Sequence, residues 1–359
     1  MNKLLLSEKT SREFVSQLFM KIGACKEHAD QVADHLTLAE MRGQASHGLN
    51  RIPFYAQKLQ KGGYNIRPEM KILKETAGTA LLDGDDALGV VSGTKAMELC
   101  IKKAKESGCA AVAVKNANHI GFLAYYTLMA AREGMIGLAI CNSGASTAVS
   151  GTSKPVLGTD PFSIALPAHR HLPLVLDCAT SVVAQGKVAV ADREGKPIPG
   201  HWAYDEEGNP TTDAGKALAG TMRPFGDYKG SGIAIMISLI CCCLTGMPFD
   251  MEEENQRRIH DATAGSALAD LFIAIDISPY ISLDSFTERV DQFIDIVKQY
   301  DLLPDTAKIY MPGEKEFDQM DCCRKTGGFE IGTNLYQKLQ EISAFYGLEY
   351  DFTSWLLKT

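Results

Sequence analysis

The stretch RGQASHGLNRIPFY, residues 42–55, places the start of a helix beside a cluster of polar side chains. Asn50 is predicted to be the N-cap, and Pro53 is tolerated only in the first turn of the helix that follows. That helix is expected over residues 51–60, because Gly62 and Gly63 end it. The stretch therefore marks the last helix of an N-terminal helical unit.

Ser46, His47, Arg51 and Tyr55 supply the chemistry of this stretch. Arg51 and Tyr55 lie one turn apart on one helix face, and the preceding loop brings the other two to the same end. Arginine can hold a carboxylate bidentately, and histidine can move a proton near neutral pH. The set suits a small carboxylate with an adjacent carbonyl or hydroxyl group. On spacing alone, a capped surface helix with solvated side chains fits equally well.

Length, charge and composition exclude several classes of protein. The chain has 359 residues and a formal net charge of −8, enough length for two modest domains. It has no basic stripe with interleaved aromatic residues, so we expect no nucleic-acid partner.

The start has three leucines before charged residues resume, which is too few for a signal peptide. Residues 232–249 are uncharged but end early at Gly246 and Pro248, which predicts a buried helix rather than a membrane span. We therefore expect a cytoplasmic protein with no membrane partner.

Ten cysteines without a secretory signal indicate free thiols in a reducing compartment. The runs Cys241–Cys243 and Cys322–Cys323 invite a metal hypothesis, but neither has C-x-x-C spacing. Adjacent cysteines on a helix point in different directions, so one run cannot chelate efficiently. We expect no metal site; a non-enzymatic thiol or metal-binding protein is the alternative that these runs leave open.

Hydrophobic periodicity divides the chain into three segments, residues 1–69, 70–225 and 226–359. The first is helical from residue 7 to about residue 43, before the helix at 51–60. The second predicts a mixed α/β domain, with strands at 70–75, 79–85, 109–116, 135–141, 161–167 and 173–177 and helices at 92–105 and 119–132. The third predicts helices at 229–246, 283–300 and 335–345 and a strand at 271–277. It is expected to pack back on the N-terminal helices as a discontinuous helical domain.

Further candidate residues follow the predicted strands. His119, in NANHIG, stands where a buried strand ends, an edge at which α/β sheets commonly place ligand groups. A histidine at such a position caps a helix or hydrogen-bonds a carbonyl about as often as it binds a ligand. Small-residue turns around Ser143, Asp177 and Lys229 let a large ligand approach the backbone. No G-x-G-x-x-G or Walker A motif occurs, so a nucleotide site here is not a standard Rossmann one.

Six blocks of the sequence resemble, in order, the blocks of one family. They are SHGLNRIPFY (46–55), NHIGFLAYY (118–126), GTDPFSIALP (158–167), VLDCATSVVAQGKV (175–188), GDYKGSGIAIMISLICCCLTG (226–246) and YMPGE (310–314). The family is the malate/L-lactate dehydrogenase type, which includes ureidoglycolate, sulfolactate and diketogulonate dehydrogenases. The resemblance covers about residues 40–315, and the blocks are specific jointly rather than singly.

The resemblance implies NAD-linked or NADP-linked reduction of 2-oxo acids to 2-hydroxy acids. It implies a non-Rossmann cofactor domain with a mixed, largely antiparallel sheet, and homodimers with active sites at the domain and subunit junction. Family roles carry over to this sequence as follows: His119 and His47 as acid/base candidates; Arg51, Ser46 and Tyr55 at the substrate; Ser143, Asp177, Cys178, Ala179, Lys229, Gly313 and Glu314 at the cofactor.

Two positions depart from the family pattern. Asp160 stands where the family usually has Asn, and GDYKGSG replaces the usual GGYKGYG. These departures bear on the substrate more than on the reaction type. The reading that results is a cytoplasmic, dimeric, malate- or lactate-like 2-hydroxy acid dehydrogenase, with His119 preferred over His47 as proton donor. A cyclic 2-imino acid reductase of the same family is the alternative.

Overall fold

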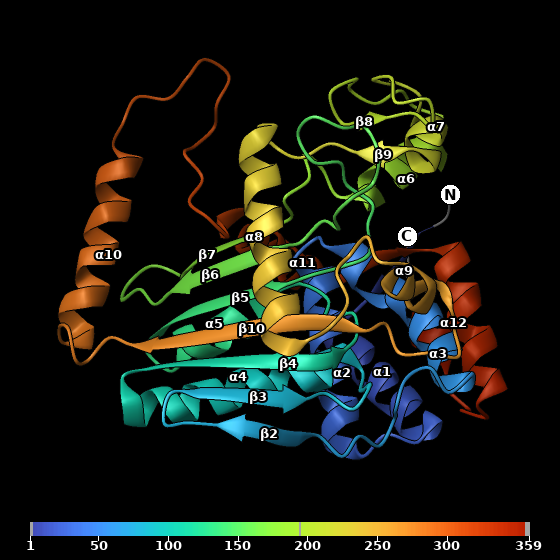
Figure 1. The fold of residues 1–359 in the computed structure, drawn as a ribbon, viewed down its shortest axis with the longest axis horizontal. Helices are drawn as coiled ribbons and strands as arrows, with labels where there is room; N and C mark the ends of the chain where they lie inside the picture. Colours follow the sequence, from blue (N-terminus) through green and yellow to red (C-terminus); the bar gives the residue numbers. More distant parts are fainter. Residues whose placement is uncertain (1–2, 194, 356–359) are drawn as a thin grey trace.

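The computed structural model describes residues 3–193 and 195–355 (Figure 1). Its strands are β1 (Lys3–Leu6), β2 (Lys71–Glu75), β3 (Thr79–Asp83), β4 (Cys109–Ala117), β5 (Met135–Cys141), β6 (Phe162–Leu166), β7 (Leu174–Cys178), β8 (Ala203–Tyr204), β9 (Thr221–Met222), β10 (Leu268–Asp276) and β11 (Phe329–Gly332). Its α-helices are α1 (Glu8–Ile22), α2 (Lys26–Met41), α3 (Ile52–Gln60), α4 (Gly89–Ser107), α5 (Ala124–Arg132), α6 (Gln185–Arg193), α7 (Ala214–Ala219), α8 (Tyr228–Thr245), α9 (Glu253–His260), α10 (Leu283–Lys298), α11 (Glu314–Thr326) and α12 (Thr333–Phe345).

The central sheet has seven strands in the order β2-β3-β4-β10-β5-β6-β7. Among these, β3 and β4 pair in parallel, and the other neighbours pair antiparallel. A doubly wound Rossmann sheet is mostly parallel, so this topology is a different one. The expected mixed α/β fold with a largely antiparallel sheet is therefore confirmed.

A strand from the last third of the chain completes the middle of this sheet. β10 lies between β4 and β5, and Phe272 sits opposite Val112 on one side and Ala139 on the other. The segment after residue 226 thus contributes to the sheet as well as to the helices. The boundaries expected at residues 69/70 and 225/226 stay predictions.

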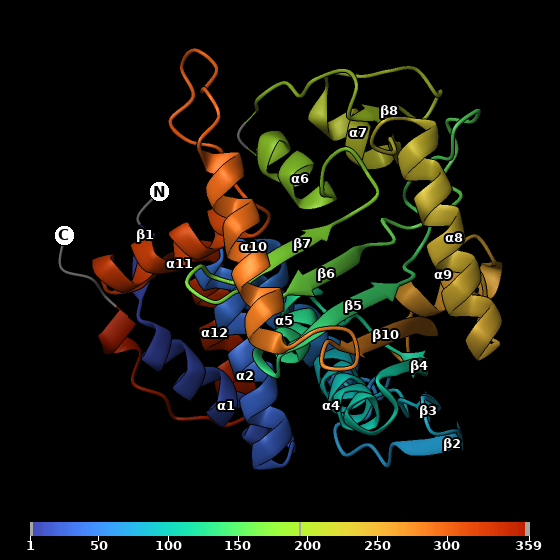
Figure 2. The same cartoon turned by 90° about the vertical axis from the view of Figure 1, so that its left-hand side faces the viewer.

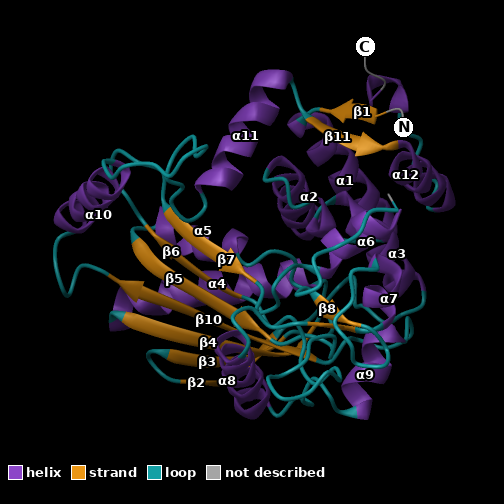
Figure 3. Cartoon of the chain, turned by 90° about the horizontal axis from the view of Figure 1, so that it is seen from above, coloured by secondary structure: helices purple, strands orange, loops and turns teal. Residues whose placement is uncertain are grey.

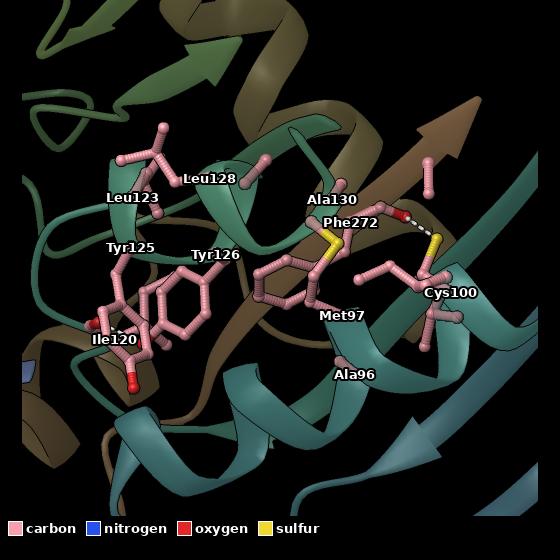
Figure 4. Packing of buried hydrophobic residues seen from close by; sticks show 14 of the residues in the cluster. Ala96, Met97, Cys100, Ile120, Leu123, Tyr125, Tyr126, Leu128, Ala130 and Phe272 are labelled. Carbon is pink, nitrogen blue, oxygen red and sulfur yellow. Dashed lines mark hydrogen bonds between the residues drawn. The ribbon is translucent and has the colours of Figure 1, made fainter. Parts of the chain in front are cut away.

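Helices cover both faces of the sheet, with α4 and α5 on one face and α8 on the other (Figure 1). On the α4/α5 side, Tyr126 and Phe272 meet edge to face at 5.3 Å between ring centroids and pack beside Met97 (Figure 4). All three side chains are buried, and burial of each contributes about 1.5–3 kcal/mol. This core holds the ends of β4 and β5, which carry the site described below.

The N-terminal helices and the end of the chain form a second packed unit beside the sheet (Figures 2 and 3). β1 pairs antiparallel with β11, α12 contacts α3, and α11 contacts α2. Phe14 and Trp355 are fully buried there, 4.8 Å apart between ring centroids. The end of the chain thus packs on the N-terminal segment through β11, α11 and α12.

Helix α8 differs from the buried helix that was expected. Ala234, Ile237 and Cys241 are buried against the sheet, whereas Met236 and Leu239 on the outer face are 56% and 42% exposed. Within the described residues, it is the helix whose length and composition would allow it to cross a membrane, and 44% of it is buried. The expectation failed because hydropathy alone does not distinguish a helix buried on all sides from one that leaves an apolar face open.

Two local expectations around the N-terminal and middle segments are also corrected. Asn50 is not the N-cap of α3: its side chain donates to the carbonyl of Ala45, and Arg51 occupies the cap position. The Gly, Pro and charged residues of segment 189–212 predict a long surface excursion, but this segment begins inside α6 and, with α7, β8 and β9, forms a small lobe around Val188 and Ala203. At Asn50 the cause is local, because residues 49–51 already form a 3₁₀ turn before α3, whereas the short helices of the lobe are stabilised by packing on one another.

Candidate functional site

Three strand ends meet at one edge of the sheet. β4, β5 and β7 run in the same direction, because each is separated from the next by one antiparallel strand. His119, Ser143 and Ala179 each follow the carboxyl end of one of these strands within two residues. The sheet therefore gathers candidate residues that lie far apart in the sequence.

Helix α3 brings Tyr55 to the same edge. Its hydroxyl group lies 2.8 Å from Nδ1 of His119, although the two residues are 64 positions apart. The ring of His47 stacks on that of His119, with 5.5 Å between centroids and 19° between planes. The two histidines that the sequence singled out thus face each other across one small site.

The loop before α3 orders the remaining polar groups. The hydroxyl of Ser46 lies 2.9 Å from Nδ1 of His47, and Nε of Arg51 donates to the carbonyl of Ser46 at 2.7 Å. These bonds leave the terminal nitrogens of the Arg51 guanidinium available for a bidentate contact with a carboxylate. The structure therefore brings Ser46, His47, Arg51, Tyr55 and His119 together.

The turn that carries His119 is held by buried groups that the sequence reading missed. Asn118 donates to the carbonyl of Ala87 and accepts the N–H of Ser266. Nε2 of His35, in α2, accepts the N–H of Phe122, and a Cβ at Gly121 would collide with the His35 ring. Gly121 also has φ +75°, which favours glycine. An amphipathic reading of α2 places His35 on its apolar face, but that pattern does not reveal its partner.

Burial controls the protonation of both histidines. Burial lowers the pKa of His119 well below its ordinary value, and the charges of Arg51 and His47 lower it further. Burial, with Arg51 as the second cause, lowers the pKa of His47 to about 4. Both imidazoles are therefore neutral at pH 7 in the free protein. A neutral imidazole can accept a proton, as a general base must.

A chain of hydrogen bonds, which begins at the Ser143 hydroxyl and continues through the backbone, joins the turns at this edge to helix α8. The hydroxyl of Ser143 accepts the N–H of Thr159 at 3.0 Å, and the carbonyl of Thr159 accepts the N–H of Thr180 at 2.8 Å. The carbonyl of Thr180 accepts the N–H of Phe225, whose own carbonyl accepts the N–H of Gly230 in the first turn of α8. Ser143 and the start of α8 are therefore parts of one connected surface.

The first turn of α8 has the groups that a dinucleotide phosphate needs. Lys229 is exposed there, and N–H groups at a helix N-terminus favour anions. Ser143 and Ala179, in the adjoining turns, are partly exposed residues. A nicotinamide dinucleotide therefore fits the residue types present at this edge.

Asp177 and Cys178 lie at the end of β7. Oδ2 of Asp177 accepts the N–H of Ala124 at 2.8 Å, at the start of α5. Burial raises the pKa of Asp177 to about 6, against the opposing effects of the Ala124 N–H and of Arg42. Burial also raises the pKa of the Cys178 thiol to about 11, so this thiol is not a thiolate at neutral pH.

Gly313 and Glu314 lie apart from this edge. The carbonyl of Pro312, next to Gly313, accepts the N–H of Val175 near the start of β7. Glu314 is engaged by Lys298, with 2.8 Å from Nζ to each carboxylate oxygen. Burial opposes its ionisation, but Lys298, the Met311 N–H and Lys308 outweigh burial and lower its pKa to about 2. A cofactor contact at Glu314 therefore requires a ligand that extends along β7.

The cysteine runs are divided between core and surface. Cys241 and Cys242 are buried and Cys243 is exposed, while Cys322 is exposed and Cys323 is buried. Over the residues that the structure describes, no group of three or more His, Cys, Asp and Glu side chains could hold a metal ion.

Comparison with known proteins gives the class and then the family. The family model described as malate/L-lactate dehydrogenase matches residues 6–340. A malate dehydrogenase from Pyrococcus horikoshii is 37% identical over 344 residues, covering 94% of this chain and 94% of that protein. The solved sulfolactate dehydrogenase from Methanocaldococcus jannaschii is 36% identical, with a TM-score of 0.89 and coverage of 96% of this chain and 98% of that one. A solved delta1-piperideine-2-carboxylate reductase from Pseudomonas syringae is 26% identical, with a TM-score of 0.82 and coverage of 94% and 99%.

The protein is an oxidoreductase that acts on a CH–OH group. It belongs to the malate/L-lactate dehydrogenase family, and membership in this family of dehydrogenases implies a nicotinamide cofactor. The family resemblance drawn from the six sequence blocks is confirmed.

Proposed function

We propose that this protein is an NAD- or NADP-dependent 2-hydroxy acid dehydrogenase that acts on a malate- or lactate-like substrate. The observation that carries the proposal is the contact of 2.8 Å between the Tyr55 hydroxyl and Nδ1 of His119, with His47 stacked on the imidazole. A hydroxyl group bound to Nδ1 directs the other ring nitrogen, Nε2, toward the reacting oxygen. Arg51, on the same loop as His47, anchors the substrate carboxylate.

His119 moves the proton in this proposal. In the oxidation of a hydroxy acid, the neutral imidazole accepts the hydroxyl proton while hydride leaves the carbon. In the reverse reaction His119 must first bind a proton. A substrate carboxylate on Arg51 favours that step, because it offsets one of the charges that depress the pKa of His119. Substrate binding and proton uptake are therefore linked.

His47 anchors the substrate rather than transferring the proton. It shares its loop with Arg51, and Ser46 holds its Nδ1 at 2.9 Å. It therefore lies beside the carboxylate that Arg51 binds. Ser46 and Tyr55 complete the substrate contacts in this assignment.

The residues that would hold the cofactor are Ser143, Asp177, Cys178, Ala179 and Lys229 along this edge, with Gly313 and Glu314 as more distant contacts. A nicotinamide ring bound there supplies or accepts the hydride. Lys229 and the first turn of α8 hold the phosphates, and Ser143 and Ala179 let the dinucleotide approach the backbone. NAD is the expected cofactor and NADP is the alternative. The substrate panel described below tests both.

The active form is a cytoplasmic homodimer in which a second copy covers α8. Support comes from the exposed apolar residues of α8 and from the groove between α8 and the sheet, lined by Leu138, Ile140, Phe162, Ile164, Ile233 and Met236. A large exposed apolar patch on a protein of this size marks an interaction surface. The net charge of −8 gives no reason to expect a nucleic acid there.

A substrate panel tests the function. Oxaloacetate, pyruvate, sulfopyruvate and 2-oxoglutarate are each mixed with NADH or NADPH, and oxidation of the cofactor is followed by absorbance. We expect turnover of at least one 2-oxo acid, and none of the matching acids that lack the 2-oxo group. Absence of turnover with every 2-oxo acid and both cofactors would contradict the proposal.

A cyclic 2-imino acid reductase is the second candidate. It is favoured by the solved delta1-piperideine-2-carboxylate reductase, which has a TM-score of 0.82 to this chain. Cofactor oxidation with methylamine plus pyruvate, well above that with pyruvate alone, would favour this candidate. Family membership, in turn, favours either enzyme over a non-enzymatic thiol or metal-binding protein.

A further inference from the structure

A pair of aspartic acids lies buried beneath the Ser143 turn. Asp160 precedes β6 and Asp250 follows α8, and both side chains are fully buried. The carboxyl group of Asp160 meets that of Asp250. Two carboxylates have no proton to share, so a contact of this kind is stable only if one of the two groups is protonated.

The hydrogen bonds around the pair show which of the two groups acts as the acceptor. Asp250 accepts three donors: Asn142 at 2.9 Å and Ser238 at 3.0 Å on Oδ1, and the N–H of Gly158 at 2.8 Å on Oδ2. Both oxygens of Asp250 are therefore occupied as hydrogen-bond acceptors. Asp250 is therefore the acceptor of the pair.

Asp160 has the complementary pattern. Its Oδ1 accepts both the N–H and the hydroxyl of Ser143, at 3.1 and 3.3 Å. Its Oδ2 is buried, and no donor among the described residues reaches it. A buried oxygen without a donor is costly unless it carries a proton of its own and donates it.

We propose that Asp160 is a positioning residue that holds a proton, donates it to Asp250 and thereby fixes the Ser143 turn for the nicotinamide cofactor. This inference rests on the proposed cofactor edge. A neutral carboxyl group has one acceptor oxygen and one donor, the same pattern as the amide of an asparagine. The φ of Asp160 is +27°, a backbone region in which Asn and Asp are enriched.

The surroundings of Asp160 disfavour a negative charge. The acidic groups that act on its surroundings are Asp250 and the thiols of Cys141, Cys241 and Cys242, and beyond them Asp270 of β10 lies near Cys141 and Cys241. All are acids, so none of them stabilises an anion. Burial, followed by the charge of Asp250, raises the pKa of Asp160 well above its ordinary value, and the Ser143 hydrogen bonds oppose this only in part.

The Ser143 turn is the first link in the chain of bonds that ends at α8. Asp160 holds Ser143, Ser143 holds Thr159, and Thr159 holds Thr180. Loss of the shared proton leaves two negative carboxylates in contact, and their repulsion displaces Asp160 and with it the Ser143 turn. Cofactor affinity is therefore expected to fall at high pH, by a cause that is separate from the histidines.

The test compares wild type with Asp160→Asn and Asp160→Ala, and uses Asp270→Asn as a matched control. Asp270 is also fully buried, and neither of its oxygens has a hydrogen-bond partner among the described residues. Infrared difference spectra at neutral pH report the carbonyl band of a protonated carboxyl group without any cofactor. NADH and NADPH titrations without substrate, from mildly acidic to alkaline pH, report the dissociation constant Kd.

We expect a carboxylic-acid band that Asp160→Asn loses and Asp270→Asn keeps. The Kd of wild type should rise with pH, and that of Asp160→Asn should stay level, because the amide cannot ionise. Asp160→Ala should weaken binding about tenfold at every pH. If the alanine variant fails to fold, the asparagine variant and the infrared spectrum still decide the result.

Two results would overturn the inference. One is the absence of an infrared band that depends on Asp160. The other is a Kd that rises with pH equally in wild type and in Asp160→Asn. A different set of results would reject the proposed function instead. In that case neither NADH nor NADPH binds wild type at any pH, but the infrared band and a pH-dependent unfolding midpoint still depend on Asp160. In that case the proton is established and the cofactor role is rejected.

Discussion

The carboxyl group of Glu40, in α2, accepts a hydrogen bond of 2.8 Å from the backbone N–H of Leu49. This bond ties the loop that carries Ser46 and His47 to a helix that also holds the His119 turn through His35. A Cβ at Gly48 would collide with the Glu40 side chain, so the loop lies directly on it. One helix therefore sets the relative position of both histidines.

Glu40→Gln should change the pH dependence of stability. Burial raises the pKa of Glu40 to about 8, and the Leu49 N–H opposes this only partly. Between the unfolded pKa and pH 8, the folded protein keeps a proton that the unfolded chain has lost, so wild-type stability falls as pH rises through this window. Glutamine keeps the acceptor for Leu49 and cannot ionise, so the variant should lose less stability. Urea unfolding at about pH 5 and about pH 8 measures the difference.

Glu27→Gln is the control for that experiment, since Glu27 is an exposed carboxylate on the same helix. It should leave the slope of stability against pH unchanged. Parallel slopes for wild type and Glu40→Gln would mean that Glu40 is ionised in the folded protein.

Arg51→Lys should weaken catalysis on a 2-oxo acid. Lysine keeps the charge but loses the planar fork that binds a carboxylate at two points, so kcat/KM should fall about tenfold or more. Steady-state kinetics with the best substrate of the panel measures the loss. Arg67→Lys, at an exposed arginine after α3, serves as the control. A variant within about twofold of wild type would remove Arg51 from the substrate site.

His119→Asn should lower kcat by about 10²-fold or more, with cofactor Kd nearly intact, because general acid–base catalysis is lost. His47→Asn should raise KM more than it lowers kcat, as expected for lost substrate binding. Initial rates over a range of substrate concentrations separate the two effects.

The pH profile of kcat provides the independent check on the two histidines. The limb due to the catalytic histidine should vanish in His119→Asn and persist in His47→Asn. If the limb survives in His119→Asn and disappears in His47→Asn, the two roles must be exchanged.

Met236→Lys should convert a dimer to a monomer. Met236 is 56% exposed on the outer face of α8, beside the apolar groove. A charge buried in an interface without a partner costs several kcal/mol, enough to dissociate a dimer at micromolar concentration. Light scattering coupled to gel filtration measures the mass. Ile72→Lys, at an exposed apolar residue on edge strand β2, should leave the mass unchanged. A dimer that withstands Met236→Lys would place the interface elsewhere.

The sequence by itself determined most of the local structure. Short apolar stretches predicted β2 to β7, because a run of apolar residues is a property of neighbouring positions. The spacing of Ser46, His47, Arg51 and Tyr55 predicted that they share one end of a helix, and the structure places them there. His119 was found from its position after a buried strand, although α5 begins later, at Ala124, than the predicted helix.

Only the tertiary structure decided what those elements meet. The insertion of β10 between β4 and β5 depends on pairing across more than 100 residues, which no local pattern encodes. The contact between Tyr55 and His119 depends on how α3 packs against the sheet edge. The pairing of Asp160 with Asp250 depends on two loops that bury both carboxyl groups in one place. Local periodicity sets which face of an element is apolar, but burial and long-range contact set which group faces another and which of them keeps its proton.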